Sequence, residues 1–256
     1  MGQSLAIVTG AAGDIGRAIA RRLRADHAVV VLADRDLAAA ERAAEALGAG
    51  FVPVQLDVTD PGACAAFAQT VAGMGDLQTL VNNAGGVQAA SLQSTSVADW
   101  QADRALNLDA VFLLFSALAE QLKATKGSVV NIASVNGLGV YGHPAYSAAK
   151  AGMIHMTRLI AVEYGKFGIR ANAVAPGTVR TQAWEARAAA NPDIFKEAAA
   201  HYPLGRIARA EDVAEAVGFL VSPLAAAITG ICLPVDCGLT AGIPALARTF
   251  SQSADF

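Results

Sequence analysis

The chain has 256 residues, of which 54% are apolar and 16% are charged, and its formal net charge is -3. This composition is sufficient for a large hydrophobic core and excludes an intrinsically disordered chain. The absence of any lysine- and arginine-rich tract argues against nucleic acid or an anionic membrane as the main partner. No linker rich in proline, glycine or serine divides the sequence, so we expect one domain over residues 1–256.

Short apolar runs alternate with longer stretches of helical periodicity along the chain. The runs are continuous in polarity, as expected for strands buried on both faces of a parallel sheet. Seven strands are predicted, at Leu5–Thr9, Ala28–Ala33, Phe51–Gln55, Thr79–Asn82, Ser128–Ala133, Ala171–Ala175 and Ile231–Val235. Helices are predicted at Gly16–Ala25, Leu37–Leu47, Ala63–Ala72, Gln101–Ala124 and Ala148–Gly165. This alternation predicts a doubly wound α/β fold with helices on both faces of the sheet.

Features that would place the chain in a membrane or an oxidising compartment are not evident. No apolar run is interpreted as long enough to span a bilayer. The N-terminus enters a predicted strand without a basic segment and signal core, so a cytoplasmic protein is expected. The cysteines Cys64, Cys232 and Cys237 show no metal or redox spacing. They are interpreted as buried or inert thiols, and no metal site is predicted.

A glycine-rich turn, Thr9–Gly16, follows the first predicted strand and opens the first helix. Glycines there let backbone amides approach a pyrophosphate, which the helix N-terminus attracts. Asp34 ends the second strand about twenty residues later, where an acidic side chain can bind ribose hydroxyls and repel a 2′-phosphate. Asp34 is otherwise a solvated loop acid or a helix cap, and the adjacent Arg35 is expected to point to solvent. The arrangement predicts a dinucleotide site that favours NAD over NADP.

Asp14 is an unusual residue in this turn. It can cap the first helix, and its carboxylate can interact favourably with the positive end of the helix dipole. It also brings a negative charge close to the expected pyrophosphate. We predict that its side chain faces away from the cofactor, so that Asp14→Gly changes NAD affinity by about 1 kcal/mol or less.

Tyr146 and Lys150 are four positions apart, which places both side chains on one face of a helix. A nearby cation lowers the pKa of a tyrosine from its usual value of about 10. A tyrosine adjusted in this way can exchange a proton with an alcohol. The pair alone is a weak signal, because the same spacing arises by chance on many helices.

With these parts in place, the chain resembles the short-chain dehydrogenase/reductase family from Leu5 to Gly238. The matching segments, in the family's order and at its usual intervals, are Thr9–Gly10 through Gly16, Asp57–Val58, Asn82–Gly85, Asn107, Ser134, Tyr146 with Lys150, and Pro176–Gly177 with Thr181. The chain departs from the family at two positions. Asp14 stands where the middle glycine of the turn is usual, and Cys237 stands where glycine often follows the last strand.

The resemblance implies a Rossmann-type seven-stranded sheet and an oxidoreductase with a catalytic tetrad of Asn107, Ser134, Tyr146 and Lys150. It implies that Tyr146 is the general acid/base, that Lys150 lowers its pKa and binds the nicotinamide ribose, and that Asn107 holds a water linking Lys150 to solvent. The expected cofactor site comprises Gly10, Asp14, Ile15, Gly16, Asp34, Arg35, Asp57, Val58, Asn83, Ala84, Gly85, Tyr146, Lys150, Pro176, Gly177, Val179 and Thr181.

The longest break in regular pattern begins at Pro176, and residues 178–204 are predicted to be a substrate loop. Substrate contacts are expected from Ser134, Asn136, His143, Tyr146 and Trp184. His143 is either a second base or an ordinary loop histidine. The residues expected around the substrate are mostly apolar. They favour a small-molecule substrate that is a secondary alcohol, polyol, sugar or cyclic alcohol.

Two other functions stay open. One is a reductase of 3-oxoacyl thioesters, which would usually use NADPH and is disfavoured by Asp34. The other is a catalytically silent dinucleotide-binding regulator, which the complete tetrad disfavours. The resemblance also implies pairing of the helices Gln101–Ala124 and Ala148–Gly165 across a dimer interface. We expect a homotetramer, with the C-terminal tail, 239–256, as a second contact.

Overall fold

The computed structural model describes residues 2–255, apart from the side chains of residues 183 and 185–187. Within this part of the chain, seven parallel strands form one sheet in the order β3-β2-β1-β4-β5-β6-β7. The strands are β1 (Ser4–Thr9), β2 (Val29–Asp34), β3 (Phe51–Gln55), β4 (Asp76–Asn82), β5 (Ser128–Ile132), β6 (Arg170–Pro176) and β7 (Cys232–Val235). Each predicted strand is present, and the ends differ from the prediction by only a few residues.

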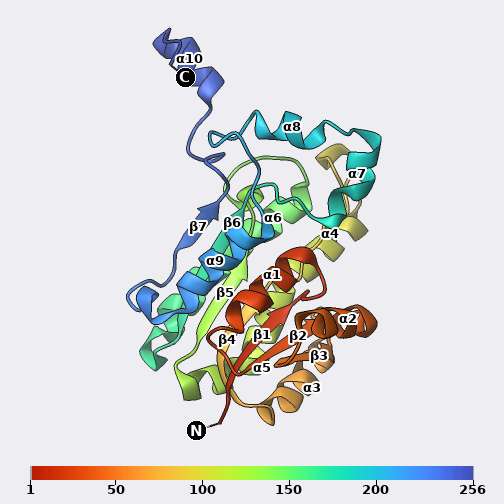
Figure 1. Cartoon of the computed structure of the whole chain (residues 1–256), viewed down its shortest axis with the longest axis vertical. Coiled ribbons are helices and arrows are strands. Elements are labelled where there is room, and N and C mark those ends of the chain that lie inside the picture. The colour runs from red at the N-terminus through yellow and green to blue at the C-terminus, as the bar shows by residue number, and fades with distance from the viewer. Residues whose placement is uncertain (1, 256) are drawn as a thin grey trace.

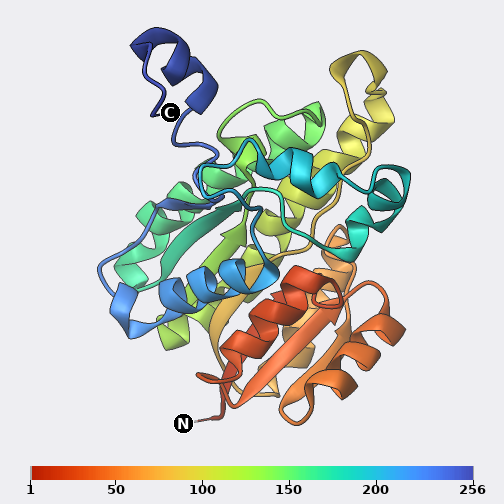
Figure 2. The same cartoon turned by 45° about the horizontal axis from the view of Figure 1, so that its top comes forward.

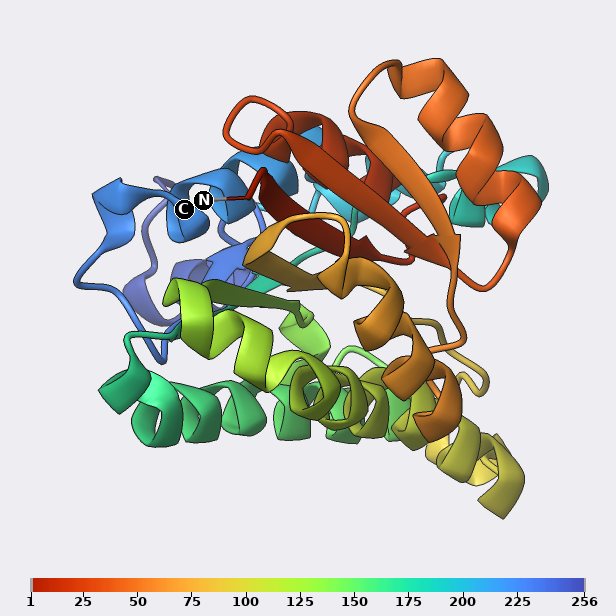
Figure 3. The same cartoon turned by 90° about the horizontal axis from the view of Figure 1, so that it is seen from below.

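Helices cover both faces of this sheet, as Figure 3 shows from below. On one face lie α1 (Asp14–Leu23), α2 (Leu37–Leu47) and α9 (Ala210–Val221), and on the other α3 (Pro61–Ala72), α5 (Ala110–Thr125) and α6 (Pro144–Tyr164). Fully buried side chains such as Ile19 and Val217 fill the first layer, and Leu118 and Ile160 fill the second. The two layers explain why the strands are apolar on both faces.

Short polar side chains set the start of several helices. Asp36 accepts a hydrogen bond from the amide of Ala39 at 3.0 Å and so begins α2. Asp60 accepts from the amides of Gly62 and Ala63 ahead of α3. Such side-chain caps satisfy amides that have no partner inside a helix. The helix starts are therefore local properties of the sequence.

One helical stretch, Val97–Thr125, contains α4 (Val97–Arg104), a π-helical turn at Ala105–Asp109 and α5. By length and composition it is apolar enough to cross a membrane. The expectation that no run is long enough for this was wrong. In the fold Leu114, Leu118 and Leu122 of α5 are fully buried against the sheet. The stretch is therefore a core helix of the α/β fold.

The topology places the site at one edge of the sheet. Because all the strands are parallel, the segments that follow them emerge at the same edge. β1 pairs with β2 on one side and with β4 on the other, for example through Ala6 and Thr79. The strand order reverses between β1 and β4, and ligands of open α/β sheets bind outside the carboxyl ends at such a point.

Two segments extend beyond the sheet (Figure 1). After β6 the chain makes an excursion, 177–209, that carries α7 (Glu185–Ala190) and α8 (Ile194–Ala199) near the carboxyl ends of the strands (Figure 2). The predicted substrate loop lies within it, and its short helices were not predicted. After β7 the tail carries α10 (Pro244–Ser251), which projects away from the body in both views. The last residue of the predicted tail lies outside the described residues.

Candidate active site

A cavity of about 1000 Å³ lies at the carboxyl ends of the central strands. The predicted site residues that line it are Ile15, Asn83, Gly85, Ser134, Asn136, His143, Tyr146, Lys150, Pro176, Gly177, Val179, Thr181 and Trp184. The predicted residues outside its lining are Gly10, Asp14, Gly16, Asp34, Arg35, Asp57, Val58, Ala84 and Asn107. The catalytic and substrate candidates are thus gathered around one space, except Asn107, and the adenosine-side candidates lie outside it.

The turn after β1 requires glycine at two positions. Gly10 has a φ of 60°, and a Cβ there would lie 2.8 Å from Cα of Ala84. A Cβ on Gly16 would lie 2.7 Å from Cα of Ala11. Gly13 precedes α1 and provides no side-chain cap. The amides of the first turn of α1 therefore need an outside acceptor, and a pyrophosphate fits this need.

Thr9 and Asn83 tie this turn to the end of β4. Nδ2 of Asn83 donates to the carbonyl oxygens of Thr9 at 2.9 Å and Gly10 at 3.1 Å. Oγ1 of Thr9 accepts from the amides of Asn83 and Ala84, each at 3.0 Å. Asn83 therefore shapes the turn through its side chain. Thr9 has a supporting role that the sequence analysis missed, since a hydroxyl at a strand end carries no distinctive pattern.

Asp34 lies where β2 ends and also supports the turn. Its Oδ2 accepts from the amide of Ala12 at 3.1 Å, and its Oδ1 accepts from the amide of Asp36 at 3.2 Å. A carboxylate oxygen has more than one acceptor position, so the group can still receive ribose hydroxyls. Arg35 is exposed.

Asp57 and Val58 follow β3 and differ in environment. Hydrogen bonds from the hydroxyl and the amide of Thr59 hold the pKa of the Asp57 carboxyl below its usual value. Val58 is buried in the core below that edge of the sheet. The charged form of Asp57 is therefore fixed at the edge where the adenine side of a dinucleotide is expected.

Asp14 is the first residue of α1, where the sequence analysis allowed for a cap. The cap position is held by Gly13, because Asp14 already has helical backbone. One carboxylate oxygen of Asp14 contacts the guanidinium of Arg17. The other accepts the backbone amide of Gln182 at 2.6 Å. The side chain of Asp14 is thus turned toward the excursion after β6.

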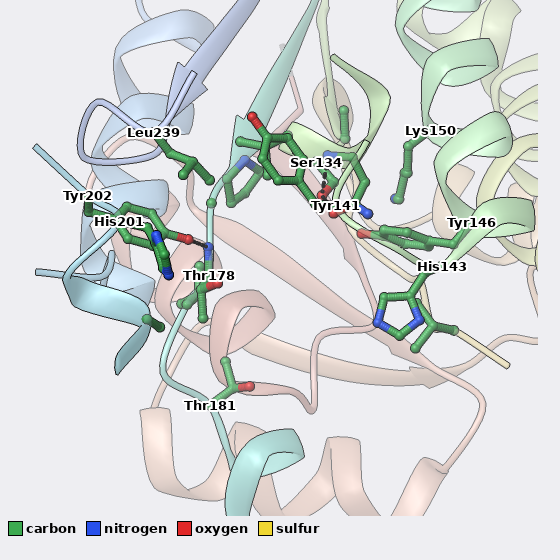
Figure 4. A pocket seen from close by; sticks show the side chains of 18 of the residues that line it. Ser134, Tyr141, His143, Tyr146, Lys150, Thr178, Thr181, His201, Tyr202 and Leu239 are labelled. Carbon is green, nitrogen blue, oxygen red and sulfur yellow. Dashed lines mark hydrogen bonds between the residues drawn. The ribbon is translucent and has the colours of Figure 1, made fainter. Parts of the chain in front are cut away.

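Ser134, Tyr146 and Lys150 meet at the cavity wall (Figure 4). Pro144 begins α6, so Tyr146 and Lys150 lie in its first turns. Nζ of Lys150 is 5.5 Å from the ring centroid of Tyr146 and donates to the carbonyl of Ile132 at 2.7 Å. Ser134 follows β5, its Oγ accepts from the amide of Asn136 at 3.1 Å, and its side chain lies near that of Tyr146 (Figure 4). The predicted trio is therefore assembled by two neighbouring elements.

Burial shifts the pKa of two of these groups. It raises the pKa of Tyr146, and the side chain of Ser134 opposes this rise. Burial lowers the pKa of Lys150 to about 7. The expectation that Lys150 lowers the pKa of Tyr146 is therefore not met in the chain alone, because burial of the phenol raises that pKa.

Asn107 is fully buried in the π-helical turn. Its Nδ2 donates to the carbonyl of Gly86 at 2.8 Å and to that of Asp103 at 2.9 Å. A Cβ on Gly85 would lie 2.9 Å from Oδ1 of Asn107 and 3.5 Å from Nζ of Lys150. Asn107 and Lys150 thus approach the same point behind the cavity. Single π-helical turns are frequent at functional sites.

His143 and Asn136 border the substrate side of the cavity. Nδ1 of His143 lies 3.0 Å from the carbonyl of Ala89, so this nitrogen carries a hydrogen. Figure 4 shows the ring close to Tyr146. Nδ2 of Asn136 donates to the carbonyl of Gly142 at 2.9 Å and to Oγ of Ser147 at 3.1 Å. The Asn136 amide therefore braces the loop before α6.

The far wall of the cavity comes from the excursion and the tail. The ring of Trp184 lies 6.1 Å from that of Phe195. Further lining residues that the sequence analysis did not name include Thr178, His201 and Leu239. They come from irregular segments, in which no hydrophobic period marks the inward side.

Comparisons with known proteins agree with this geometry. A family model described as enoyl-(acyl carrier protein) reductase matches residues 10–240. The inactive 2-(S)-hydroxypropyl-CoM dehydrogenase 2 of Xanthobacter autotrophicus is 42% identical over 84% of this chain and 96% of that protein. Meso-2,3-butanediol dehydrogenase of Serratia marcescens is 38% identical over 92% and 94%. The crystal structure of an oxidoreductase of the short chain dehydrogenase/reductase family from Burkholderia thailandensis has a TM-score of 0.94 and 43% identity, covering 100% of both chains.

Proposed function

Since the chain belongs to the short-chain dehydrogenase/reductase family, we propose that it is an NAD-dependent dehydrogenase of secondary alcohols. It transfers a hydride between a nicotinamide cofactor and a secondary alcohol or ketone. The observation that carries this function is the meeting of Ser134, Tyr146 and Lys150 at one cavity wall. The glycine turn at the start of α1 supports the dinucleotide site.

Proton transfer is assigned to Tyr146. In oxidation its phenolate accepts the hydroxyl proton of the alcohol, and in reduction its hydroxyl returns the proton. Ser134 donates a hydrogen bond to the substrate oxygen and stabilises the charge that develops there. Lys150, when protonated, favours the phenolate, and the Ile132 carbonyl fixes its Nζ. The nicotinamide, when bound, supplies the hydride chemistry.

The preference for NAD rests on Asp34. Its carboxylate stands at the end of β2 and is held by the amide of Ala12 in the glycine turn. This position suits the ribose hydroxyls of NAD, whereas a 2′-phosphate would meet a like charge.

The substrate proposed is an uncharged secondary alcohol such as a polyol, sugar, or cyclic or aliphatic alcohol. Among the described residues that line the cavity, Lys150 is the one lysine and there is no arginine. Aromatic and apolar side chains such as Val87, Tyr141 and Trp184 make up much of the wall. A butanediol dehydrogenase among the relatives supports this substrate class.

We also propose a cytoplasmic homotetramer. The outer surfaces of α5 and α6 expose Phe112, Leu159 and Val162. Apolar side chains on two adjacent helices are typical of surfaces that pair between subunits.

A coenzyme comparison tests the proposal. The enzyme is assayed at alkaline pH with NAD or NADP and a panel of secondary alcohols, polyols and sugars, following the absorbance of the reduced coenzyme. We expect kcat/KM with NAD to exceed that with NADP by about tenfold or more. Asp34→Asn keeps an oxygen acceptor for the Ala12 amide and removes the charge, so it should narrow this preference.

Two outcomes would contradict the proposal. A preference for NADP would overturn the cofactor assignment and favour a thioester reductase. Binding of NAD without turnover of any alcohol would favour a silent dinucleotide-binding protein.

A further inference from the structure

The base of the excursion after β6 is held by hydrogen bonds within the excursion and by two from its backbone to Val235 and Cys237. The amide of Thr178 donates to the hydroxyl of Tyr202 at 2.9 Å, and the carbonyl of Thr178 accepts from the amide of Ala208 at 3.1 Å. Val179 and Ala208 form an isolated parallel bridge. These contacts hold the two ends of the loop together. They do not fix the residues between the two ends, which need other contacts.

The next fixed point is Gln182, which is held by α1. Its backbone amide donates to Oδ2 of Asp14 at 2.6 Å, across 168 positions of sequence. Thr181 precedes Gln182, Trp184 follows shortly after it, and both line the cavity. The carboxylate of Asp14 therefore fixes the backbone between two cavity-lining residues, Thr181 of the expected cofactor site and Trp184 of the expected substrate site.

The charge of Asp14 is balanced on the other side by Arg17. The guanidinium of Arg17 contacts Oδ1 of Asp14 and donates through Nη1 to the carbonyl of Ala12 at 3.1 Å. A chain of polar contacts thus runs from the glycine turn through Arg17 and Asp14 to the backbone of Gln182. A glycine in place of Asp14 would have no side chain to make this connection.

We propose that Asp14 is a positioning residue that anchors the substrate loop to the cofactor-binding turn. It holds the amide of Gln182 so that Thr181 and Trp184 face the cavity, and Arg17 neutralises its charge beside the pyrophosphate site. The role rests on the proposed function for its kinetic consequence, whereas the anchoring itself is a property of the chain without coenzyme. Asp14 acts here through the loop and makes no contact with the reacting atoms.

The test uses two variants that break the same hydrogen bond from opposite sides. Asp14→Ala removes the acceptor, and Gln182→Pro removes the backbone donor at the first position of a short helix, where proline is tolerated. Gln182→Ala is the matched control, because it keeps the backbone amide and changes an exposed side chain outside the cavity lining. Hydrogen–deuterium exchange is measured over residues 178–204 without coenzyme, together with kinetics for the alcohol and the Kd of NAD.

We expect Asp14→Ala and Gln182→Pro each to speed exchange in the loop and to lower kcat/KM for the alcohol by about tenfold. The Kd of NAD should change by less than about fivefold, which corresponds to about 1 kcal/mol. The double variant should resemble either single variant, because both substitutions remove the same hydrogen bond. Gln182→Ala should behave as the wild type.

Unchanged loop exchange in Asp14→Ala would overturn the proposal. The proposal would also be overturned if the decreases in kcat/KM of the two single variants multiplied in the double variant. If the wild type turns over no alcohol, the proposed function fails, and the exchange measurements still decide whether Asp14 anchors the loop.

Discussion

At the residue scale, Tyr146 is the group to which proton transfer in the site is assigned. Its hydroxyl meets Ser134 at the cavity wall. Tyr146→Phe keeps the ring and removes the proton carrier, so kcat should fall by at least about 10²-fold while NAD still binds. Steady-state kinetics and coenzyme fluorescence measure the two effects. Tyr164→Phe, at the other end of α6 and outside the cavity lining, is the control. Turnover close to wild type in Tyr146→Phe would reject the assignment.

Lys150 gives a second prediction at this scale, because its burial costs stability. Its pKa falls from 10.5 to about 7 on folding. Below pH 7 Lys150 is protonated in both the folded and the unfolded chain, so the full cost of burying its charge lowers the free energy of unfolding. Between pH 7 and 10.5 the unfolded chain binds more protons, so the free energy of unfolding rises with pH.

Lys150→Met lacks this ionisation. The variant should therefore be most favoured over the wild type below pH 7, and its advantage should shrink toward pH 10.5. Each unit of pKa shift corresponds to about 1.4 kcal/mol. Urea unfolding of the coenzyme-free protein across this pH range measures the difference. A difference that is independent of pH would show that burial of the charge is not its cause.

The identity and placement of these site residues could be predicted from the sequence, whereas their burial and their contacts could not. The four-residue spacing placed Tyr146 and Lys150 on one helical face, as the structure has them. The pKa of Lys150 was not foreseen, because its burial depends on the carbonyl of Ile132 and on packing between separate elements. The same holds for Asp14, whose partner Gln182 is distant in sequence.

At the element scale, the turn between β1 and α1 has glycines of unequal importance. Gly10 has a positive φ, and a Cβ there would meet the backbone of Ala84 at 2.8 Å. Gly13 has a φ of -75°, and a Cβ there would meet only the carbonyl of Gly10 at 3.5 Å. Gly10→Ala should lower the free energy of unfolding by about 2 kcal/mol and weaken NAD binding, since backbone strain and overlap add.

Gly13→Ala is the matched comparison and should stay within about 0.5 kcal/mol of the wild type. Thermal unfolding and NAD titration of both variants provide the measurement. Equal effects of the two substitutions would mean that the shape of the turn does not depend on Gly10.

Elements with a strong hydrophobic pattern were predicted well, and those defined by distant contacts were not. The strand Phe51–Gln55 and the helix Leu37–Leu47 match the structure at both ends. The helices α7 and α8 were missed, because they lie in an excursion whose form depends on its neighbours. Cys237 has a φ of 51°, in the left-handed region that favours glycine. This explains physically why glycine suits that position.

At the scale of the whole molecule, assembly is the main prediction. Val162 is 84% exposed on α6, and Phe112 is 55% exposed on α5. We expect light scattering to report a tetramer at micromolar concentration. Val162→Glu should give a smaller species, because a charge would be buried in the interface. Leu92→Glu, which is exposed outside these helices, should leave the mass unchanged. A monomeric wild type would overturn the assembly.

The strand order was not contained in the local pattern of the chain. Alternating strands and helices predict a doubly wound sheet, and they do not state which strands are neighbours. The resemblance to a known family implied a Rossmann-type seven-stranded sheet, and the structure adds the order of its strands, with β1 beside β4. Whole-molecule features therefore required either relatives or coordinates.

The pairing of β1 with β4 also sets an order of events while the chain is being synthesised. β1 can be covered by β2 once residue 34 has emerged, but its other edge needs residues 76–82. A nascent chain that ends between these points exposes the unpaired edge of a strand whose side chains are almost all buried in the finished fold. The second edge of β1 is thus paired only after β4 has emerged, and during this interval the free edge is open to aggregation or to binding by a chaperone.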